Sequence, residues 1–354
     1  MTVSPMAPVA TPTGRGAQAR ARILARTETR LDALLAAERA QWAGVDARAI
    51  APVESVGQLV RAGGKRLRPA FCAAGFLAAG GEETDTRVVE AAAAVELLHA
   101  FALIHDDVID DSPLRRGEPT AHVRAIEQHR ALGWHGEARR YGEGVAVLAG
   151  DLALSYAMRL AQELPATARG VWGELVTEMI VGQHLDVAVA AEGVADTRLS
   201  EYIANAKSGR YSIRRPLELG AAITGNTTLA ATFEAYGAAL GEAFQLRDDL
   251  IDAFGDADVA GKPVGADAEN NKMTLLMSLA VGRSERVRDL VSAGGRDETA
   301  LRAEIAAIDV RAEVERRIDT LVDQAREALA NAPLPQEWRE ELAGMAVAVA
   351  YRDK

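Results

Sequence analysis

The stretch that decides the fold is residues 84–111, which read TDTRVVEAAAAVELLHAFALIHDDVIDD. Alanine and leucine favour helices, and the apolar residues between Ala91 and Leu103 would cover nearly the whole circumference of a helix. A helix that is apolar on all sides must be buried among other elements. The segment therefore predicts a central helix over about 84–110 that ends in a run of aspartates.

The rest of the chain favours the same class of structure. Aromatic residues make up only 5% of the sequence, and no stretch alternates convincingly between apolar and polar residues as a half-buried strand would. Breakers such as Gly80-Gly81 separate the periodic segments, and no change of composition marks a linker. We expect a single all-α domain over 21–354, preceded by a mobile tail over 1–20. The other helices are expected at about 145–164, 166–190, 229–253, 297–329 (a pair) and 336–350.

Composition excludes several classes of protein. The 354 residues include 51 acidic and 40 basic side chains, so the formal net charge is -11. This balance argues against broad binding to nucleic acid, because such binding depends on neutralising phosphates. No run reaches the roughly 18 apolar residues of a membrane-spanning helix, and residues 1–20 lack the apolar core of a signal peptide. Cys72 is the only cysteine, which excludes an intrachain disulfide, fits a cytoplasmic location and predicts a small buried side chain.

Two clusters of aspartate follow apolar helices. The first contains Asp106 and Asp110, and the second contains Asp248, Asp249 and Asp252. Residues four apart lie about 40° apart on one helix face, so like charges meet there and require compensation. A divalent cation is the simplest compensation, and ligands that are all oxygen favour Mg²⁺, with Mn²⁺ as the alternative. Solvated helix ends or a general acid/base pair would also place carboxylates here, but the repeated spacing favours metal.

Basic residues are concentrated near the same segments. Gly63-Gly64 precedes three cations at 65, 66 and 68, and Arg115-Arg116 follows the first aspartate cluster. Arginine binds phosphate oxygens through two N–H groups, and lysine supplies a compact charge. Any one of these side chains could be ordinary surface charge. Together with two metal-type clusters, they predict a site for two polyphosphates. Further candidate cations are Lys207, Lys262 and Lys272.

These motifs together resemble the trans-isoprenyl diphosphate synthases, the polyprenyl synthetase family. The resemblance implies a fold of mostly antiparallel helices around a deep central cavity, usually in a homodimer. It also implies head-to-tail prenyl transfer from an allylic diphosphate to isopentenyl diphosphate. The similar segments run from about Val56 to the C-terminus and read GGKRLRP at 63–69, DDVIDDSPLRRG at 106–117, AGD at 149–151, GQHLD at 182–186, FQLRDDLID at 244–252 and GKPVGADAENNK at 261–272, with a basic tail at 351–354.

The resemblance also implies a role for individual residues. Metal ligands would be Asp106, Asp110 and Asp248, with Asp249 and Asp252 beside them. Isopentenyl diphosphate would be held by Lys65, Arg68, His99 and Arg116. The allylic diphosphate would be held by Arg115, Lys207, Ser208, Gln245, Lys262 and Lys272, and its pocket lined by Gln183 and Asp186. His105 is expected to be structural.

Product length is the least direct inference. In the family, bulky residues four and five positions before the first aspartate motif shorten the product. Phe101 is large and Ala102 is small, which resembles the short-chain geranylgeranyl diphosphate synthases. Farnesyl diphosphate is the alternative product. A class I terpene cyclase and a non-catalytic modulating subunit remain as alternatives of other classes, although the paired motifs favour an enzyme with two diphosphates.

Overall fold

The computed structural model describes residues 14–192, 197–255, 274–292 and 298–352, and these are overwhelmingly helical. The all-α prediction is therefore confirmed. The one sheet among these residues is a hairpin of β1 (Leu114–Arg115) and β2 (Glu118–Pro119), which the sequence did not predict. The helices of the first half are α1 (Arg15–Ala43), η1 (Ala47–Ile50), α2 (Ala51–Arg61), α3 (Leu67–Ala78), α4 (Arg87–Ile109), α5 (Ala121–Ala131), α6 (Ala138–Gln162) and α7 (Ala166–Glu192).

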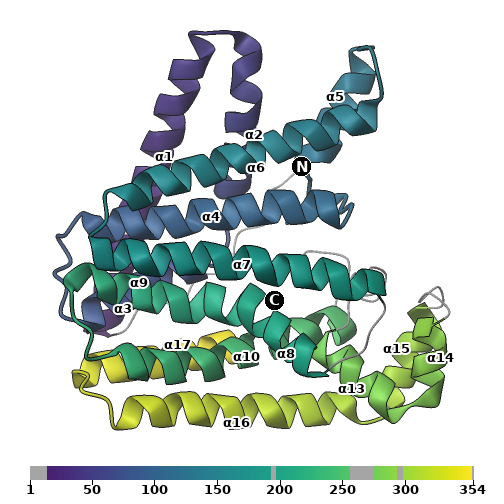
Figure 1. Ribbon diagram of the computed structural model, residues 1–354. Helices are drawn as coiled ribbons and strands as arrows, with labels where there is room; N and C mark the ends of the chain where they lie inside the picture. The colour runs from purple at the N-terminus through teal and green to yellow at the C-terminus, as the bar shows by residue number, and fades with distance from the viewer. Residues whose placement is uncertain (1–13, 193–196, 256–273, 293–297, 353–354) are drawn as a thin grey trace, which may run out of the picture.

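The second half continues the helical pattern. In Figure 1, α4, α7 and α16 run across the view with roughly aligned axes, and α1 and α2 stand steeply at the top. The remaining elements are α8 (Thr197–Ala204), the π-helix η2 (Asn205–Arg214), α9 (Arg215–Thr224), α10 (Ala230–Phe254), α13 (Leu275–Arg283), α14 (Glu285–Ser292), α15 (Glu298–Ala307), α16 (Val310–Ala330) and α17 (Gln336–Ala350).

Helix α4 lies at the centre of the hydrophobic core. Ala91 to Ala94 and the pair Leu97-Leu98 have essentially no exposed surface. Helices α6, α3 and α1 pack on α4, which explains why its sequence has no polar stripe. Both α4 and α6 are long and apolar enough to cross a membrane, but 72% of the most apolar window of α4 is buried inside the fold. Burial of this kind is expected of a core helix.

Two glycines allow α3 and α9 to approach closely. A Cβ atom on Gly75 would lie 2.1 Å from the carbonyl oxygen of Leu217, and one on Gly220 would lie 2.0 Å from that of Cys72. Any larger residue would push the two helices apart. Cys72 is fully buried at this contact, and burial raises the pKa of its thiol to about 12. It is the small core residue that the sequence predicted.

The expected helix at 336–350 is reproduced to the residue, and those near 84–110, 166–190 and 229–253 within three residues at either end. The helix expected at 145–164 begins earlier, at Ala138, and the N-terminal boundary was wrong. Residues 15–20 belong to α1 rather than to a tail, because Gly16 and Ala17 are buried where α1 meets Trp338 of α17. Apolar contact with a distant helix orders this end of α1, and local composition gave no sign of it.

Candidate active site

The first aspartate cluster lies where α4 ends. Asp106 is half-buried, and its Oδ1 accepts a hydrogen bond of 3.0 Å from Nε2 of Gln183 on α7. Gln183 and Asp106 are far apart in the sequence, and both were predicted to belong to the site. The structure thus places α7 directly beside the first cluster.

Arg115 lies against the same cluster. Its Nε donates to Oδ1 of Asp107 over 2.6 Å, and its Nη2 lies 3.5 Å from Oδ2 of Asp106. Asp107 is only 3% exposed. Burial raises the pKa of the Asp107 carboxyl to about 6, although Arg115 acts in the opposite direction. Arg115, expected to hold a diphosphate, here neutralises the carboxylates.

The β1–β2 turn positions the two neighbouring arginines differently. Arg116 and Gly117 occupy the turn with positive φ angles of 55° and 80°, as a tight hairpin turn requires. The Arg116 guanidinium turns toward α2 and donates to the carbonyl oxygens of Leu59 and Gly63. A Cβ atom on Gly64 would lie 2.9 Å from that guanidinium, so the glycine pair makes room for it. This contact joins the GGKRLRP and RRG segments.

The three cations of the GGKRLRP segment do different things. Lys65 is exposed to solvent. Arg66 has a left-handed backbone with φ of 48°, and its guanidinium binds Glu28 and Glu96 at 2.5 Å each. Arg66 therefore stabilises the fold, and its acidic partners could not be inferred from local sequence.

Arg68, Tyr211 and His99 form a compact group, which we call the Arg68 pocket. The Arg68 guanidinium carbon lies 4.3 Å from the centre of the Tyr211 ring, and the Tyr211 hydroxyl lies 3.3 Å from Nδ1 of His99. Burial, reinforced by the positive charge of Arg68, lowers the pKa of His99 well below its usual value. Nε of Arg68 is buried and makes no hydrogen bond. An unsatisfied buried donor on a cation suits an anionic ligand.

Tyr211 was missed by the sequence analysis. It lies on the π-helix η2, whose wider turn is common at functional sites. The same segment carries Lys207 and Ser208, whose side chains lie outside the described residues. Lys262 and Lys272 also lie outside the described residues.

The second aspartate cluster lies near the end of α10. Asp249 and Asp252 are 3% and 4% exposed, and Nε2 of Gln245 donates to Oδ1 of Asp249 over 2.7 Å. Asp248 is less buried, and its Oδ1 binds Nη2 of Arg352, beyond the end of α17. Arg352 also stacks on Phe244, with 4.0 Å between the guanidinium carbon and the ring centre. The C-terminal end of the described chain therefore lies against this cluster.

A pair of glycines fixes η2 against α10. A Cβ atom on Gly241 would lie 2.5 Å from Cα of Gly209, and one on Gly209 would lie 2.8 Å from the Gly241 carbonyl carbon. Because η2 also packs on α7, this contact links α10 to the helix that carries Gln183. The two aspartate clusters are thus related through α7 and η2.

Both clusters have the chemistry of a site for a hard divalent cation. Their donors are carboxylate oxygens, which Mg²⁺ and Mn²⁺ prefer. Within the part of the chain that the structure describes, no three acidic, histidine or cysteine side chains already surround one point. The type of donor therefore fits a divalent cation. The described side chains, however, do not already converge on a single point where the ion would lie.

The residues expected to set product length lie further back on α4. Phe101 is buried, and its ring contacts the edge of His105 with 4.7 Å between ring centres. His105 in turn lies 3.0 Å from the carbonyl oxygen of Val147 on α6, and Gly150 leaves room for the imidazole. Phe101 thus lies on the side of α4 that faces α6, whereas Asp106 faces α7. His105 packs α4 on α6, as the structural role expected for it would require.

Known proteins with similar sequences place the chain in a family. A sequence profile of the family described as Polyprenyl synthetase matches residues 53–308. A short chain isoprenyl diphosphate synthase of Methanothermobacter thermautotrophicus is 36% identical over 71% of this chain and 74% of its own. A geranylfarnesyl diphosphate synthase of Aeropyrum pernix is 31% identical over 80% of this chain and 88% of its own.

Solved structures that resemble this chain come from the same kind of protein as the similar sequences. The crystal structure of a geranylgeranyl pyrophosphate synthase from Corynebacterium glutamicum, complexed with isoprenyl diphosphate and magnesium, superimposes with a TM-score of 0.86 at 35% identity. The match covers 95% of this chain and 98% of that one. The chain therefore belongs to the polyprenyl synthetase family, whose members are trans-prenyl diphosphate synthases.

Proposed function

We propose that this trans-prenyltransferase condenses isopentenyl diphosphate with an allylic diphosphate and releases geranylgeranyl diphosphate. The observation that carries the two-substrate assignment is the Arg68 pocket, where a buried cationic donor has no hydrogen-bond partner. This pocket and the paired aspartate clusters provide separate environments for two diphosphates. Arg68, His99 and Arg116 would hold isopentenyl diphosphate, together with Lys65 at the exposed rim. The allylic diphosphate would lie between the clusters, beside Arg115, Gln245 and the cations of η2.

Mg²⁺ would bind Asp106 and Asp110 on one side and Asp248, with Asp249 and Asp252 nearby, on the other. When bound, it would neutralise the charge that grows on the leaving diphosphate. Residues of the chain itself would orient the metal ligands and add further positive charge. Gln183 orients the Asp106 carboxylate through its hydrogen bond. Arg115 supplies a fixed positive charge beside the leaving group, where preorganised donors stabilise developing charge.

Carbon–carbon bond formation follows from this placement. The allylic C–O bond breaks, the double bond of isopentenyl diphosphate attacks the allylic carbon, and a proton leaves the new chain, with the released diphosphate as its acceptor. Holding the two substrates in neighbouring pockets removes most of the entropic cost of their encounter. His99 is neutral in the pocket, so it adds no charge and serves as a hydrogen-bonding partner.

The length of the product is assigned from α4. Phe101 is the bulky residue that precedes the first motif, and Ala102 leaves space on the adjacent position. Product sizing after incubation with isopentenyl diphosphate, each allylic primer in turn and Mg²⁺ tests the assignment. A C20 product is expected. A C15 product would replace it with farnesyl diphosphate synthesis, cyclic hydrocarbon from one diphosphate would indicate a cyclase, and no turnover would indicate a non-catalytic subunit.

We also propose that the chain acts as a cytoplasmic homodimer. Helices α6 and α7 present Leu148, Met158, Ile180 and Val187 with at least 41% of each exposed, although these are apolar residues. A second copy would cover such faces in an isologous contact. Light scattering should give twice the chain mass, and Leu148→Asp with Ile180→Asp should give the monomer. A monomeric wild type would contradict the dimer.

A further inference from the structure

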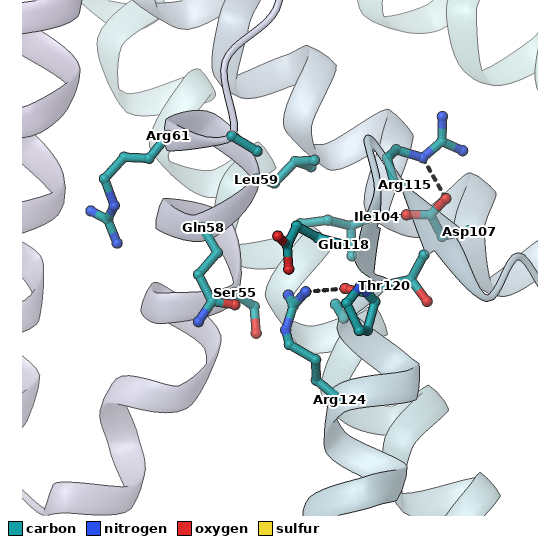
Figure 2. A pocket seen from close by; sticks show the side chains of 13 residues that line it. Ser55, Gln58, Leu59, Arg61, Ile104, Asp107, Arg115, Glu118, Thr120 and Arg124 are labelled. Atoms are coloured by element: carbon teal, nitrogen blue, oxygen red, sulfur yellow. Dashed lines mark hydrogen bonds and ion pairs between the residues drawn. The ribbon is translucent and has the colours of Figure 1, made fainter. Parts of the chain in front are cut away.

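A cavity of about 430 Å³ lies on the α2 side of the first aspartate cluster. Figure 2 shows it between α2, the end of α4, the β1–β2 hairpin and the start of α5. Among the residues assigned to the substrates and the metal whose side chains the structure describes, only Arg115 borders it. Lys65, Arg68, His99, Gln245 and Asp248 do not. It is therefore separate from the Arg68 pocket and from the second cluster.

A half-buried arginine inside the cavity lacks an acidic partner. Arg124 donates to the carbonyl oxygen of Pro119, and no carboxylate of the described residues lies within ion-pair distance of its guanidinium. Burial lowers the pKa of Arg124, although Glu118 and Asp107 attract the charge from further away. A cation that has left bulk water without a counter-ion favours an anionic ligand.

The N-terminus of α5 adds to this preference. Helix α5 begins at Ala121 beside the cavity, and its first turn contains no acidic residue. The Thr120 hydroxyl donates to the carbonyl oxygen of Ser112 and does not cap the helix. The first N–H groups of a helix carry partial positive charge and suit the oxygens of a phosphate. Arg124 and this helix end thus attract the same kind of ligand.

Part of the remaining wall is apolar, and part carries the carboxylates of Asp107 and Glu118. The Asp107 carboxylate is already paired with Arg115. Leu59, Ile104 and Pro119 line the cavity, and its volume lies in the range of small-molecule sites. A free inorganic anion would leave these walls without a partner. The geometry suits a phosphate monoester that carries a small apolar group.

The cavity communicates with the first aspartate cluster through Arg115. Arg115 borders the cavity, and its guanidinium binds Asp107 and Asp106. An anion in the cavity would compete with these carboxylates for the same charge. We propose that the cavity is a regulatory site for a phosphate monoester with a small apolar body, and that its occupation lowers turnover by drawing Arg115 away from the first cluster. The effect on turnover rests on the proposed function, whereas the binding does not.

Calorimetric titration with phenyl phosphate tests the binding. Arg124→Gln should weaken it at least tenfold, because it removes the cation that has no partner. Arg68→Gln, which alters the Arg68 pocket, should leave the affinity within twofold. No binding to the wild type at 10 mM, or an equal loss in Arg68→Gln, would overturn the site.

A second pair of variants guards against misfolding of Arg124→Gln. Gln58 is exposed at the edge of the cavity, so Gln58→Glu adds a negative charge there without disturbing the core. It should weaken binding at least threefold, whereas Gln41→Glu, an equal change on the exposed surface of α1, should have no effect. Equal affinities in both variants would contradict the site.

The same probe tests the regulation. Phenyl phosphate should lower kcat without raising the KM of either substrate, and Gln58→Glu should need at least threefold more of it for half inhibition. Inhibition that competes with a substrate would overturn the link through Arg115. A chain that binds the probe but shows no turnover would refute the proposed function and leave the site intact.

Discussion

Arg352 binds Asp248 directly, so the C-terminal end of the described chain supplies a positive charge to the second aspartate cluster. The same guanidinium donates to the carbonyl oxygen of Val349 over 2.9 Å and stacks on Phe244. Its side chain is only 9% exposed. A metal ion that binds Asp248 would meet this charge, so Arg352 and the ion compete for one carboxylate.

Replacing Arg352 should therefore strengthen metal binding. We expect Arg352→Gln to lower the Mg²⁺ concentration for half-maximal turnover by about threefold or more, because one competing charge-assisted bond is removed. Titration of activity with Mg²⁺ measures this. Arg247→Gln is the matched control, because Arg247 holds the same chain end through the carbonyl oxygen of Ala350 and binds no carboxylate among the described residues. A higher Mg²⁺ requirement in Arg352→Gln would contradict the competition.

The sequence predicted the parts of the fold that depend on local pattern. Helix α4 could be predicted because its apolar circumference follows directly from residues 84–111, and α17 because breakers flank a periodic segment. The pairings of Arg352 with Asp248 and of Arg66 with Glu28 and Glu96 could not, because each joins segments far apart in the chain. Periodicity carries no information about such contacts.

In the candidate site, too, local sequence predicted some residues, whereas contacts between distant segments were not predictable. Spacing identified the two aspartate clusters, and the family resemblance identified Gln183. Neither pointed to Tyr211, which reaches Arg68 and His99 from the π-helix. A helical wheel drawn with 3.6 residues per turn misplaces side chains along a π-helix. The role of Gly241 was equally hidden, because a glycine in the middle of a helix reveals nothing about the backbone that it meets.

The aspartate clusters should be essential for turnover. Asp106→Ala or Asp248→Ala should lower kcat by several powers of ten, because loss of several kcal/mol of charge stabilisation corresponds to a factor of ten for about each 1.36 kcal/mol. Circular dichroism should show an unchanged helix content. Asp32→Ala, at an exposed position on α1, is the control and should retain full activity. Activity within tenfold of the wild type in either cluster variant would refute the metal assignment.

The contact between Gly241 and Gly209 should limit which residues α10 accepts. Gly241→Ala should reduce the free energy of unfolding by about 1–3 kcal/mol, because its Cβ would overlap the backbone of η2. Turnover should fall with it, since η2 carries Lys207. Thermal denaturation measures the stability.

Gly144→Ala provides the matched control for this variant. Gly144 also lies within a helix, but a Cβ atom there would meet nothing within 4 Å. Higher helix propensity should then raise stability by about 0.5–1 kcal/mol. A gain of similar size in Gly241→Ala would show that the two helices can separate without cost.

The half-buried histidine of the Arg68 pocket should make stability depend on pH. The pKa of His99 is lowered in the folded state, so the folded protein binds fewer protons than the unfolded chain. The free energy of unfolding should therefore fall as the pH drops below about 6.5, by at most about 1.4 kcal/mol per pH unit for one proton. Urea denaturation between pH 7.5 and 5 should show a shallower slope in His99→Asn. His184→Asn, at an exposed position on α7, should keep the wild-type slope, and equal slopes in all three proteins would exclude His99 as the source.

Phe101 should limit the length of the product. Phe101→Ala opens space between α4 and α6, and we expect products longer than C20 by one or more isoprene units. Because truncation of a buried phenylalanine costs about 3–5 kcal/mol, thermal denaturation must show that the variant remains folded at the assay temperature. Phe101→Leu keeps more of the volume and should give a smaller shift in the same direction. A product distribution identical to that of the wild type in Phe101→Ala would show that Phe101 does not limit the product length. The next test would be a bulky side chain at Ala102, on the side of α4 that carries Asp106.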